Sequence, residues 1–285
     1  ITDGIFMVKI DSLGNLIYNA DVGIVGRGHA IKQTLDEGFI ITGWDNLNDF
    51  NKNLILIKTN SMGDTIWTKS FDLLDIGNSW DYGWDVLQNT DSGFIICGIG
   101  EDLDGQFARL IKTDSLGNEV WSKKLEVNQG GLGATSIEHT TDDGYIVAVP
   151  GAGLYKINID GNQEWVNNMI PFAFDVQQTE DGGYITTGLT NSPNYAENFC
   201  LAKLDSDGVL EWEKIFGDGS EGSNFSYSVQ QTEDGGYIMG GWLLSGAFLL
   251  KTDSFGNQEW IREFGENIPS GWEVQLTNDG GYAFS

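Results

Sequence analysis

Two short patterns of apolar and polar residues alternate along the whole chain. The first leads from an apolar residue through Gln or Thr to an acidic residue, a glycine and an aromatic residue, as in Val176-Gln-Gln-Thr-Glu-Asp-Gly-Gly-Tyr184. The second has the form Lys-x-Asp-Ser-x-Gly-Asn-x-x-Trp, as in Lys112 to Trp121. Acidic residues and glycines at these places supply the side-chain caps and positive φ angles of tight turns, so each pattern predicts a β-hairpin. The apolar runs beside the turns are short, which favours strands over helices.

Each pattern occurs six times. Two hairpins make a four-stranded unit, which is the size of one blade of a β-propeller. The aromatic residues that end the second pattern, at positions 18, 67, 121, 165, 212 and 260, are 44 to 54 residues apart. Copies of the first pattern begin at Ile31, Val86, Ile137, Val176, Val229 and Val274, and copies of the second begin at Lys9, Lys58, Lys112, Lys156, Lys203 and Lys251.

The order of the patterns predicts how the repeats are completed. The chain opens with a hairpin of the second type and stops after one of the first type, so the two are complementary halves. We therefore expect one all-β domain over residues 1–285, a six-bladed β-propeller of four-stranded blades whose ring is closed by pairing the N- and C-terminal half-blades. A piece cut from a longer array is the alternative. The expected blades cover approximately 29–71, 84–125, 135–170, 174–217, 227–265, and 272–285 together with 1–20.

Composition narrows the range of partners. The chain has 42 acidic and 15 basic residues and a formal net charge of -27. Such a surface repels the phosphates of nucleic acid and the anionic leaflet of a membrane, so we expect no nucleic-acid partner. No run of eighteen apolar residues is present, so we expect no membrane insertion. The charge instead favours solubility and cationic partners.

Neither the cysteines nor the acidic turns indicate a cofactor. Cys97 and Cys200 both lie in strand-like apolar runs, which favours two buried free thiols over a disulfide. Bound Ca²⁺ is an alternative for two turns with alternating acidic residues, although neither has the downstream glutamate of a full calcium loop. The candidate ligands are Asp102, Asp104, Asp205 and Asp207.

The repeat resembles those of two groups of propellers. The segment from Asp114 to Trp121 and its copies resemble the tryptophan-docking motif of quinoprotein propellers, but depart from it by one residue and lack its Thr-Gly-Lys turn. The whole two-hairpin unit is more similar to propeller-like repeats of secreted bacterial proteins, notably surface proteins of Bacteroidetes. This second resemblance covers nearly the whole chain. It implies the fold and an extracellular or cell-surface location, and it says little about the ligand.

The repeated tryptophans and lysines have structural interpretations. A large aromatic side chain at an equivalent place in every repeat is expected to pack between blades. The repeated lysines lie near acidic turns, which predicts ion pairs within the blades rather than a cationic binding ring.

A candidate binding surface follows from the variable positions. The residue two before the first-pattern Val or Ile is aromatic in four of six blades and would line the mouth of the central channel on the loop-rich face. An aromatic rim with carboxylates can stack on sugars and hydrogen-bond their hydroxyl groups; side chains that merely plug the channel are the alternative. The candidate ligand-binding residues are His29, Trp84, Phe174, Tyr227 and Trp272, together with Trp44, Trp242, Asp85, Asp175 and Glu273, and Trp80, Tyr82 and Tyr195 lie near them in the sequence.

Three functions remain open. The first is a non-enzymatic extracellular binding or display module whose ligand is a glycan or a protein, within a larger surface protein or alone. The second is a carbohydrate-active enzyme that uses two carboxylates of the same face. The third is a structural repeat domain of a larger adhesin or filament. The sequence has only two histidines, no Gly-x-Ser-x-Gly and no His-Glu-x-x-His, so it points to no catalytic residue.

Overall fold

The structure is a computed structural model in which the described residues form strands and turns. It describes residues 4–48, 51–72, 80–125, 133–190, 198–217, 224–243, 246–265, 273–277 and 279–284. The chain divides into two compact units, residues 1–137 and 138–285, which are described separately below. In the part of the chain that is described, no helix has the length and hydrophobicity needed to span a bilayer.

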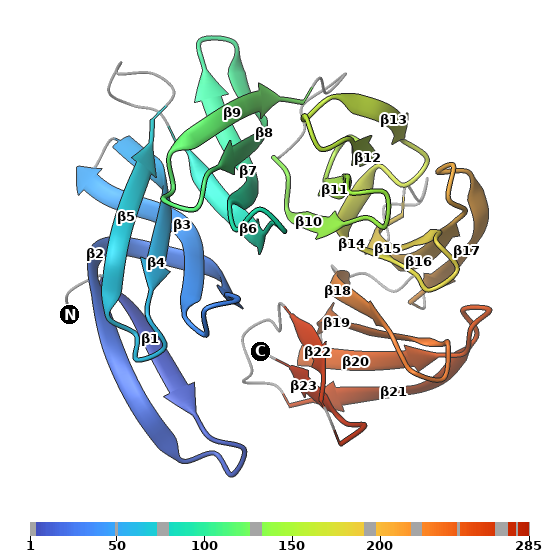
Figure 1. The fold of residues 1–285 in the computed structure, drawn as a ribbon. Coiled ribbons are helices and arrows are strands. Elements are labelled where there is room, and N and C mark those ends of the chain that lie inside the picture. The colour runs from blue at the N-terminus through green and yellow to red at the C-terminus, as the bar shows by residue number, and fades with distance from the viewer. Residues whose placement is uncertain are drawn as a thin grey trace. The chain divides into compact units, whose positions relative to one another are not determined.

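The first unit contains two antiparallel meanders (Figure 1). The first sheet has five strands in the order β1-β2-β3-β4-β5, and the second has four in the order β6-β7-β8-β9. Strand β2 is long enough to pair with β1 near its start and with β3 near its end. The bounds are β1 Gly4–Ile10, β2 Leu16–Gln33, β3 Phe39–Asn48, β4 Asn51–Thr59, β5 Thr65–Phe71, β6 Tyr82–Gln88, β7 Phe94–Asp102, β8 Gly105–Thr113 and β9 Glu119–Lys124.

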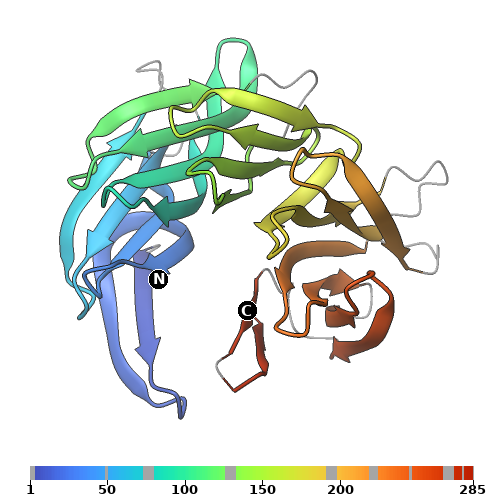
Figure 2. The same ribbon diagram turned by 45° about the vertical axis from the view of Figure 1, so that its right-hand side comes forward.

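The second unit contains three four-stranded meanders and one two-stranded sheet (Figure 1 and Figure 2). Strand β10 (Ser136–His139) begins at the boundary between the units and precedes β11 Tyr145–Val149, β12 Gly153–Ile157 and β13 Gln163–Asn167. The next sheets are β14 Phe172–Gln178, β15 Tyr184–Leu189, β16 Phe199–Leu204 and β17 Leu210–Phe216, then β18 Phe225–Gln231, β19 Tyr237–Leu243, β20 Gly246–Thr252 and β21 Gln258–Phe264, and finally β22 Val274–Leu276 with β23 Tyr282–Phe284.

The expectation of six four-stranded blades is wrong. Five sheets correspond to expected blades, but the half-blades at the two ends do not build a sixth sheet. The N-terminal hairpin extends the first sheet because β2 continues without interruption from its pairing with β1 into its pairing with β3. The C-terminal hairpin forms a two-stranded sheet of its own, in which Gln275 pairs with Ala283. A repeat count identifies hairpins, but it does not determine which free edge each hairpin pairs with.

The turn of the first pattern is built around an ion pair. In this turn Gly182 adopts φ +82°, and Gly183 allows the turn to approach the neighbouring strand because a Cβ there would collide with Lys203 Nζ and the carbonyl oxygen of Leu204. The lysine can therefore reach the turn carboxylate of Asp181. The same pairing joins Lys58 to Asp36, Lys112 to Asp91, Lys156 to Asp142, Lys203 to Asp181 and Lys251 to Asp234, at 2.9, 3.5, 3.0, 3.0 and 2.9 Å. These distances confirm the predicted structural role of five of the six repeated lysines.

The turn of the second pattern presents a glycine to the tryptophan of the preceding sheet. Asp253 Oδ1 accepts hydrogen bonds from the backbone N–H groups of Phe255 and Asn257, which closes the turn, and Gly256 has φ +75°. A Cβ on Gly256 would lie 2.6 Å from Cζ3 of Trp212. The Trp212 ring also packs at 5.9 Å, centroid to centroid, against Tyr237 of the next sheet. The corresponding pairs Trp67–Phe94, Trp165–Tyr184 and Trp260–Tyr282 lie 5.6 to 5.9 Å apart, so these tryptophans pack between sheets as predicted.

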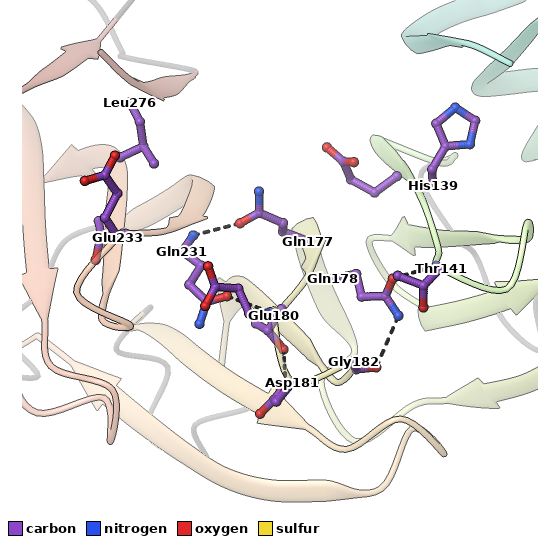
Figure 3. A pocket seen from close by; sticks show the side chains of 13 residues that line it. His139, Thr141, Gln177, Gln178, Glu180, Asp181, Gly182, Gln231, Glu233 and Leu276 are labelled. Carbon is purple, nitrogen blue, oxygen red and sulfur yellow. Dashed lines mark hydrogen bonds between the residues drawn. The ribbon is translucent and has the colours of Figure 1, made fainter. Parts of the chain in front are cut away.

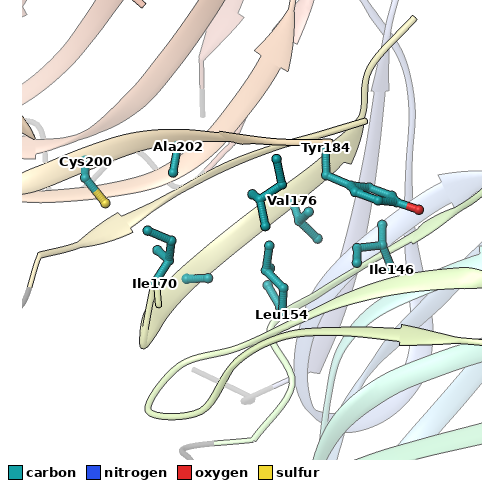
Figure 4. Close-up of a cluster of buried hydrophobic side chains, with 10 residues drawn as sticks. Ile146, Leu154, Ile170, Val176, Tyr184, Cys200 and Ala202 are labelled. Carbon is teal, nitrogen blue, oxygen red and sulfur yellow. The ribbon is translucent and has the colours of Figure 1, made fainter. Parts of the chain in front are cut away.

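Apolar side chains fill the spaces between neighbouring sheets. In the second unit, Ile146 and Leu154 meet Val176, Tyr184 and other side chains of the next sheet in one buried cluster (Figure 4). Cys200 belongs to this cluster, and Cys97 is likewise buried in the first unit; both are free, as predicted. Burial raises the pKa of the Cys200 thiol to about 12, so this side chain behaves as a small apolar group.

Repeated glutamines connect successive sheets at the turns. The backbone N–H of Glu180 donates to Gln231 Oε1 of the following sheet at 2.9 Å, and that of Thr141 donates in the same way to Gln178 at 2.8 Å. In the first unit the N–H of Leu35 donates to Gln88 at 2.8 Å. These bonds explain why the first pattern carries a glutamine, because its amide satisfies a turn N–H that has no partner in its own sheet.

Candidate functional site

Five aromatic side chains that the sequence singled out come together in the first unit. His29 lies in β2, and Trp80 precedes β6. Trp44 of β3 and Tyr82 and Trp84 of β6 lie toward the strand ends that are remote from the first-pattern turns. We call this group, together with Lys52 of β4, the loop-side aromatic cluster. Gly83 lets the strands approach closely, since a Cβ there would collide with the Thr42 side chain of β3.

His29 and Trp84 form the more enclosed part of the cluster. Their rings are stacked with centroids 4.2 Å apart and an angle of 10° between the planes. The Nδ1–H of His29 donates to the carbonyl oxygen of Gly83 at 2.9 Å. Burial lowers the pKa of His29, so its ring is neutral at physiological pH. The stack therefore supplies a flat apolar wall rather than a charge.

Lys52 lies among the remaining rings. Its Nζ is 4.3 Å from the ring centroid of Trp44, 5.1 Å from that of Trp80 and 5.7 Å from that of Tyr82. Trp44 and Tyr82 meet edge to face at 5.9 Å. Trp80 is held at its backbone by a bridge to Lys52, yet 46% of its surface is exposed. The cluster thus offers solvent an indole ring beside an ammonium group.

Carboxylates behind the cluster anchor the surrounding backbone. Asp45 accepts hydrogen bonds from the N–H of Asn53 and the hydroxyl of Ser70, both at 3.1 Å. Burial raises the pKa of Asp45. Glu101 accepts the backbone N–H of Trp80 at 2.9 Å. These bonds fix the loop-side ends of β3, β4 and β7, which holds the aromatic cluster in place.

A buried ion pair lies beside these carboxylates. Asp81 is fully buried, and its Oδ1 is 3.5 Å from Nη1 of Arg109. Arg109 Nε also donates to the hydroxyl of Ser122 at 3.2 Å. The backbone N–H of Asp81 donates to the carbonyl oxygen of Lys52, so this pair connects the second sheet with the strand that carries the lysine.

A smaller aromatic group occupies the matching place in the second unit. Phe225 and Tyr227 of β18 are stacked at 5.7 Å, and Phe174 of β14 meets the Tyr227 ring edge to face at 5.3 Å. Trp242 pairs with Phe225 in the β18–β19 register. Two of the predicted aromatic residues, Phe174 and Tyr227, are therefore in contact here.

The predicted acidic residues have varied positions. Asp175 accepts the N–H of Val176 at 2.9 Å and that of Val229, in the next sheet, at 2.8 Å. Asp85 makes the corresponding bonds to Val86 and Ile137, so both carboxylates connect neighbouring strands. Glu273 is exposed and accepts a bond from Gln275. Trp272 and Tyr195 lie outside the described residues.

The candidate calcium ligands form turns in this structure. Asp102 Oδ1 accepts the N–H of Asp104, and its Oδ2 is 2.8 Å from Lys124. Asp205 Oδ1 accepts the N–H groups of Asp207 and Val209. Over the described ranges, no group of three or more His, Cys, Asp or Glu side chains is placed to hold a metal ion.

Sequence reasoning missed an acidic cavity in the second unit. It has a volume of about 680 Å³ and is lined by residues at the turn ends of β10, β14, β18 and β22 and in the turns that follow the first three of these strands (Figure 3). Glu138, Glu180 and Glu233 line it with His139, and Gln178 and Gln231 take part in the turn bonds described above. The repeated glutamines in the sequence were the signal that could have indicated this cavity. No signal could have indicated Lys52 of the aromatic cluster, because no other repeat carries a lysine at the equivalent position.

No family model matches the chain, and no curated protein matches it. Solved structures do match. A protein of unknown function from Bacteroides caccae has a TM-score of 0.57 at 10% identity, over 87% of this chain and 86% of the other. The Dos1 propeller has a TM-score of 0.61 at 12% identity, over 98% of this chain and 69% of the other.

A third structure places a similar fold in a longer protein. The extracellular domain of a putative hybrid two-component system from B. thetaiotaomicron has a TM-score of 0.56 at 12% identity. The match covers 95% of this chain and 34% of the other. At such identities these structures are similar in fold alone. With the antiparallel sheets and their repeated turns, they show that this chain has an all-β fold of the propeller type.

Proposed function

We propose that this chain is an extracellular, non-enzymatic binding module that takes a glycan on the loop-side aromatic cluster. The observation that carries the proposal is the exposed Trp80 ring beside Trp44 and the ammonium group of Lys52. The extracellular location is supported by the resemblance of the repeat to secreted bacterial proteins and by the printed description of one similar structure as an extracellular domain.

The chemistry of the cluster suits a sugar. The C–H face of a pyranose ring stacks on an indole, and the hydroxyl groups around the ring need nearby donors and acceptors. Trp80 supplies the stacking surface, and Lys52 supplies three N–H donors on a side chain that the rings hold in position. The anchored strands beneath keep these groups fixed, which lowers the entropic cost of binding.

The same geometry gives less support to a glycosidase. Two catalytic carboxylates must face the scissile bond, one as an acid and one as a base or nucleophile. Asp45, Asp81 and Glu101 instead accept hydrogen bonds from groups of the protein itself. The proposal therefore assigns these three carboxylates to the support of the binding surface.

A glycan array followed by calorimetry tests the proposal. We expect specific hits with the wild-type chain and a loss of affinity of roughly tenfold or more in Trp80→Ala, because stacked aromatic anchors commonly contribute more than about 1.4 kcal/mol. Phe255→Ala is the matched control, since it removes an exposed aromatic ring from a turn of the second unit.

Two results would contradict the proposal. A folded protein that binds no glycan on the array would move the assignment to a protein ligand or a structural role. Equal losses in Trp80→Ala and Phe255→Ala would show that the glycan lies elsewhere on the chain.

A further inference from the structure

Strand β1 has an unusual surface for this protein. It pairs with β2 through contacts such as Met7 with Ala20. Ile5 and Met7 are buried against side chains of β2, β3 and β4, while Phe6, Val8 and Ile10 on the other side are 57%, 62% and 57% exposed. In the described part of the chain no strand pairs with the second edge of β1. Unpaired edges beside exposed apolar side chains are ready acceptors for another strand.

The other sheets show what such an edge accepts. The strands equivalent to β1 are β4, β8, β12, β16 and β20, and each has neighbours on both edges. One neighbour is always the second strand of a first-pattern hairpin. The register of this pairing is the same in every sheet. The residue that follows the Phe or Tyr of the first pattern pairs with the repeated lysine, as Ile185 does with Lys203 and Ile238 with Lys251.

Lys9 is the sixth repeated lysine and differs from the other five. Each of those five forms an ion pair with the acidic residue of the adjoining turn, for example Lys251 with Asp234 at 2.9 Å. Lys9 instead lies over Phe39 and Tyr18, with Nζ 5.5 and 6.0 Å from the ring centroids, and it has no carboxylate partner among the described residues. An Asp-x-Gly turn placed beside Lys9, as in the complete sheets, would supply the carboxylate that the other five lysines have.

Hairpin β22–β23 carries the complementary features. It is a first-pattern hairpin, and among the described residues β23 pairs with β22 along one edge only. Its turn carboxylate, Asp279, accepts bonds from Thr277 and Gly281 within the turn, as Asp234 does from Thr232 and Gly236. Asp234 has Lys251 as its counter-ion, whereas no lysine pairs with Asp279 over the described ranges.

We infer that β1 of one copy of this chain accepts β23 of a second copy. The register of the complete sheets places Tyr282 opposite Ile10, Ala283 opposite Lys9, and Phe284 opposite Val8. It also places Asp279 beside Lys9. The association pairs the edges of β1 and β23 that have no partner among the described residues, and it places Phe284 and Tyr282 beside the exposed side chains of Val8 and Ile10. Because it joins two different surfaces, it is head-to-tail and builds either a closed ring of copies or an open chain.

Cross-linking of two single-cysteine variants tests the inference. Val8→Cys and Phe284→Cys place their thiols opposite each other on one face of the proposed sheet, and Cys97 and Cys200 are buried. When the two proteins are mixed with a short bismaleimide, we expect a covalent heterodimer. Leu116→Cys replaces Val8→Cys in the control, because Leu116 is equally exposed but lies in a turn far along the sequence from β1. No heterodimer above this control would overturn the inference.

The double variant Val8→Cys, Phe284→Cys removes an ambiguity. Cross-linking within single chains, without cross-linking in the mixture, would also overturn the inference, because it would show that each β1 takes up the hairpin of its own chain.

A charge exchange tests the role of Lys9. We expect Lys9→Glu to weaken self-association by roughly tenfold in sedimentation equilibrium, since it puts like charges together. Mixing Lys9→Glu with Asp279→Lys should restore association between unlike copies. Unchanged association in Lys9→Glu, with an unchanged thermal melt as proof of folding, would remove the lysine from the interface. These tests leave the glycan site untouched, so they can fail independently of the proposed function.

Discussion

The contact between Gly256 and Trp212 allows a quantitative test of how neighbouring sheets are held together. The perturbation is Gly256→Ala, which adds one methyl group to a turn of the β20–β21 hairpin. Two separate costs follow. The residue must keep φ +75°, and the new Cβ must lie 2.6 Å from Trp212 Cζ3 and 2.8 Å from Lys214 Cγ unless these groups move.

The two costs can be separated with a second glycine. A non-glycine residue at positive φ costs about 1–2 kcal/mol. Gly182→Ala measures this cost alone, because Gly182 has φ +82° with nothing within 4 Å of its Cβ position. Overpacking against an ordered ring adds about 1–3 kcal/mol. We therefore expect Gly256→Ala to destabilise the protein by about 2–5 kcal/mol, clearly more than Gly182→Ala does.

Urea denaturation of five proteins provides the assay: the wild type, Gly182→Ala, Gly256→Ala, Trp212→Ala and the double variant Gly256→Ala, Trp212→Ala. Their free energies of unfolding are compared where the m-values agree. Truncating the half-buried Trp212 should cost about 3 kcal/mol, at the lower end for a large aromatic side chain. In the double variant the methyl group no longer meets a ring, so the overpacking cost of about 1–3 kcal/mol should disappear from the sum.

Two outcomes would contradict a tight contact between Gly256 and Trp212. Equal destabilisation by Gly256→Ala and Gly182→Ala would show that the methyl group meets no resistance from the ring. Strict additivity in the double-mutant cycle would show that Trp212 does not dock on this turn in solution.

Two further predictions concern the first-pattern turns. Ser92 has φ 65° at the position where Gly182 stands in its own turn, so Ser92→Gly should stabilise the protein by about 0.5–1 kcal/mol, seen as a higher urea midpoint; a lower midpoint would contradict the strain. The Thr232 hydroxyl and the Lys251 ammonium hold the pKa of Asp234 at about 2, against 3.8 ordinarily. A depressed folded-state pKa stabilises the fold above the ordinary value, and this contribution is lost as the pH falls through about 2. Asp234→Asn should therefore reduce the loss of stability between about pH 4 and about pH 2, measured by the same denaturation, and identical pH profiles would contradict it.

The hairpins and their internal pairing could be predicted from sequence because their determinants are local. An acidic residue followed by two glycines specifies the turn at Asp181 whatever lies around it, and the Lys203 pairing follows from the repeat. The sixth blade could not be predicted correctly, since it depends on which edge β1 and β23 meet. The continuous strand β2 carried no distinct sequence signal either, because its apolar residues do not mark where one sheet partner replaces the other.

The candidate site was predicted in part for the same reason. His29 and Trp84 stand at a fixed offset from a repeated apolar residue, so their neighbourhood could be inferred and the stacking is observed. Lys52 has no counterpart in other repeats, and only the fold shows that it lies among three rings. Asp85 and Asp175 directly follow the residues at this offset and were predicted together with them. Their carboxylates accept hydrogen bonds from the backbone of the neighbouring strand.

The glutamine bonds between sheets bear on how this protein could change in evolution. Each bond joins a turn to the next repeat through one neutral hydrogen bond, such as that from Glu180 to Gln231, which contributes about 0.5–1.5 kcal/mol. A duplication or deletion of one whole repeat reproduces this bond at the new junction wherever the following repeat carries the glutamine, as the repeats with Gln88, Gln178 and Gln231 do and those with His139 and Leu276 do not. Loss of a single glutamine, by contrast, leaves a turn N–H without its acceptor. As far as these bonds decide, a whole repeat can therefore be gained or lost at such a junction with less cost than the replacement of one glutamine.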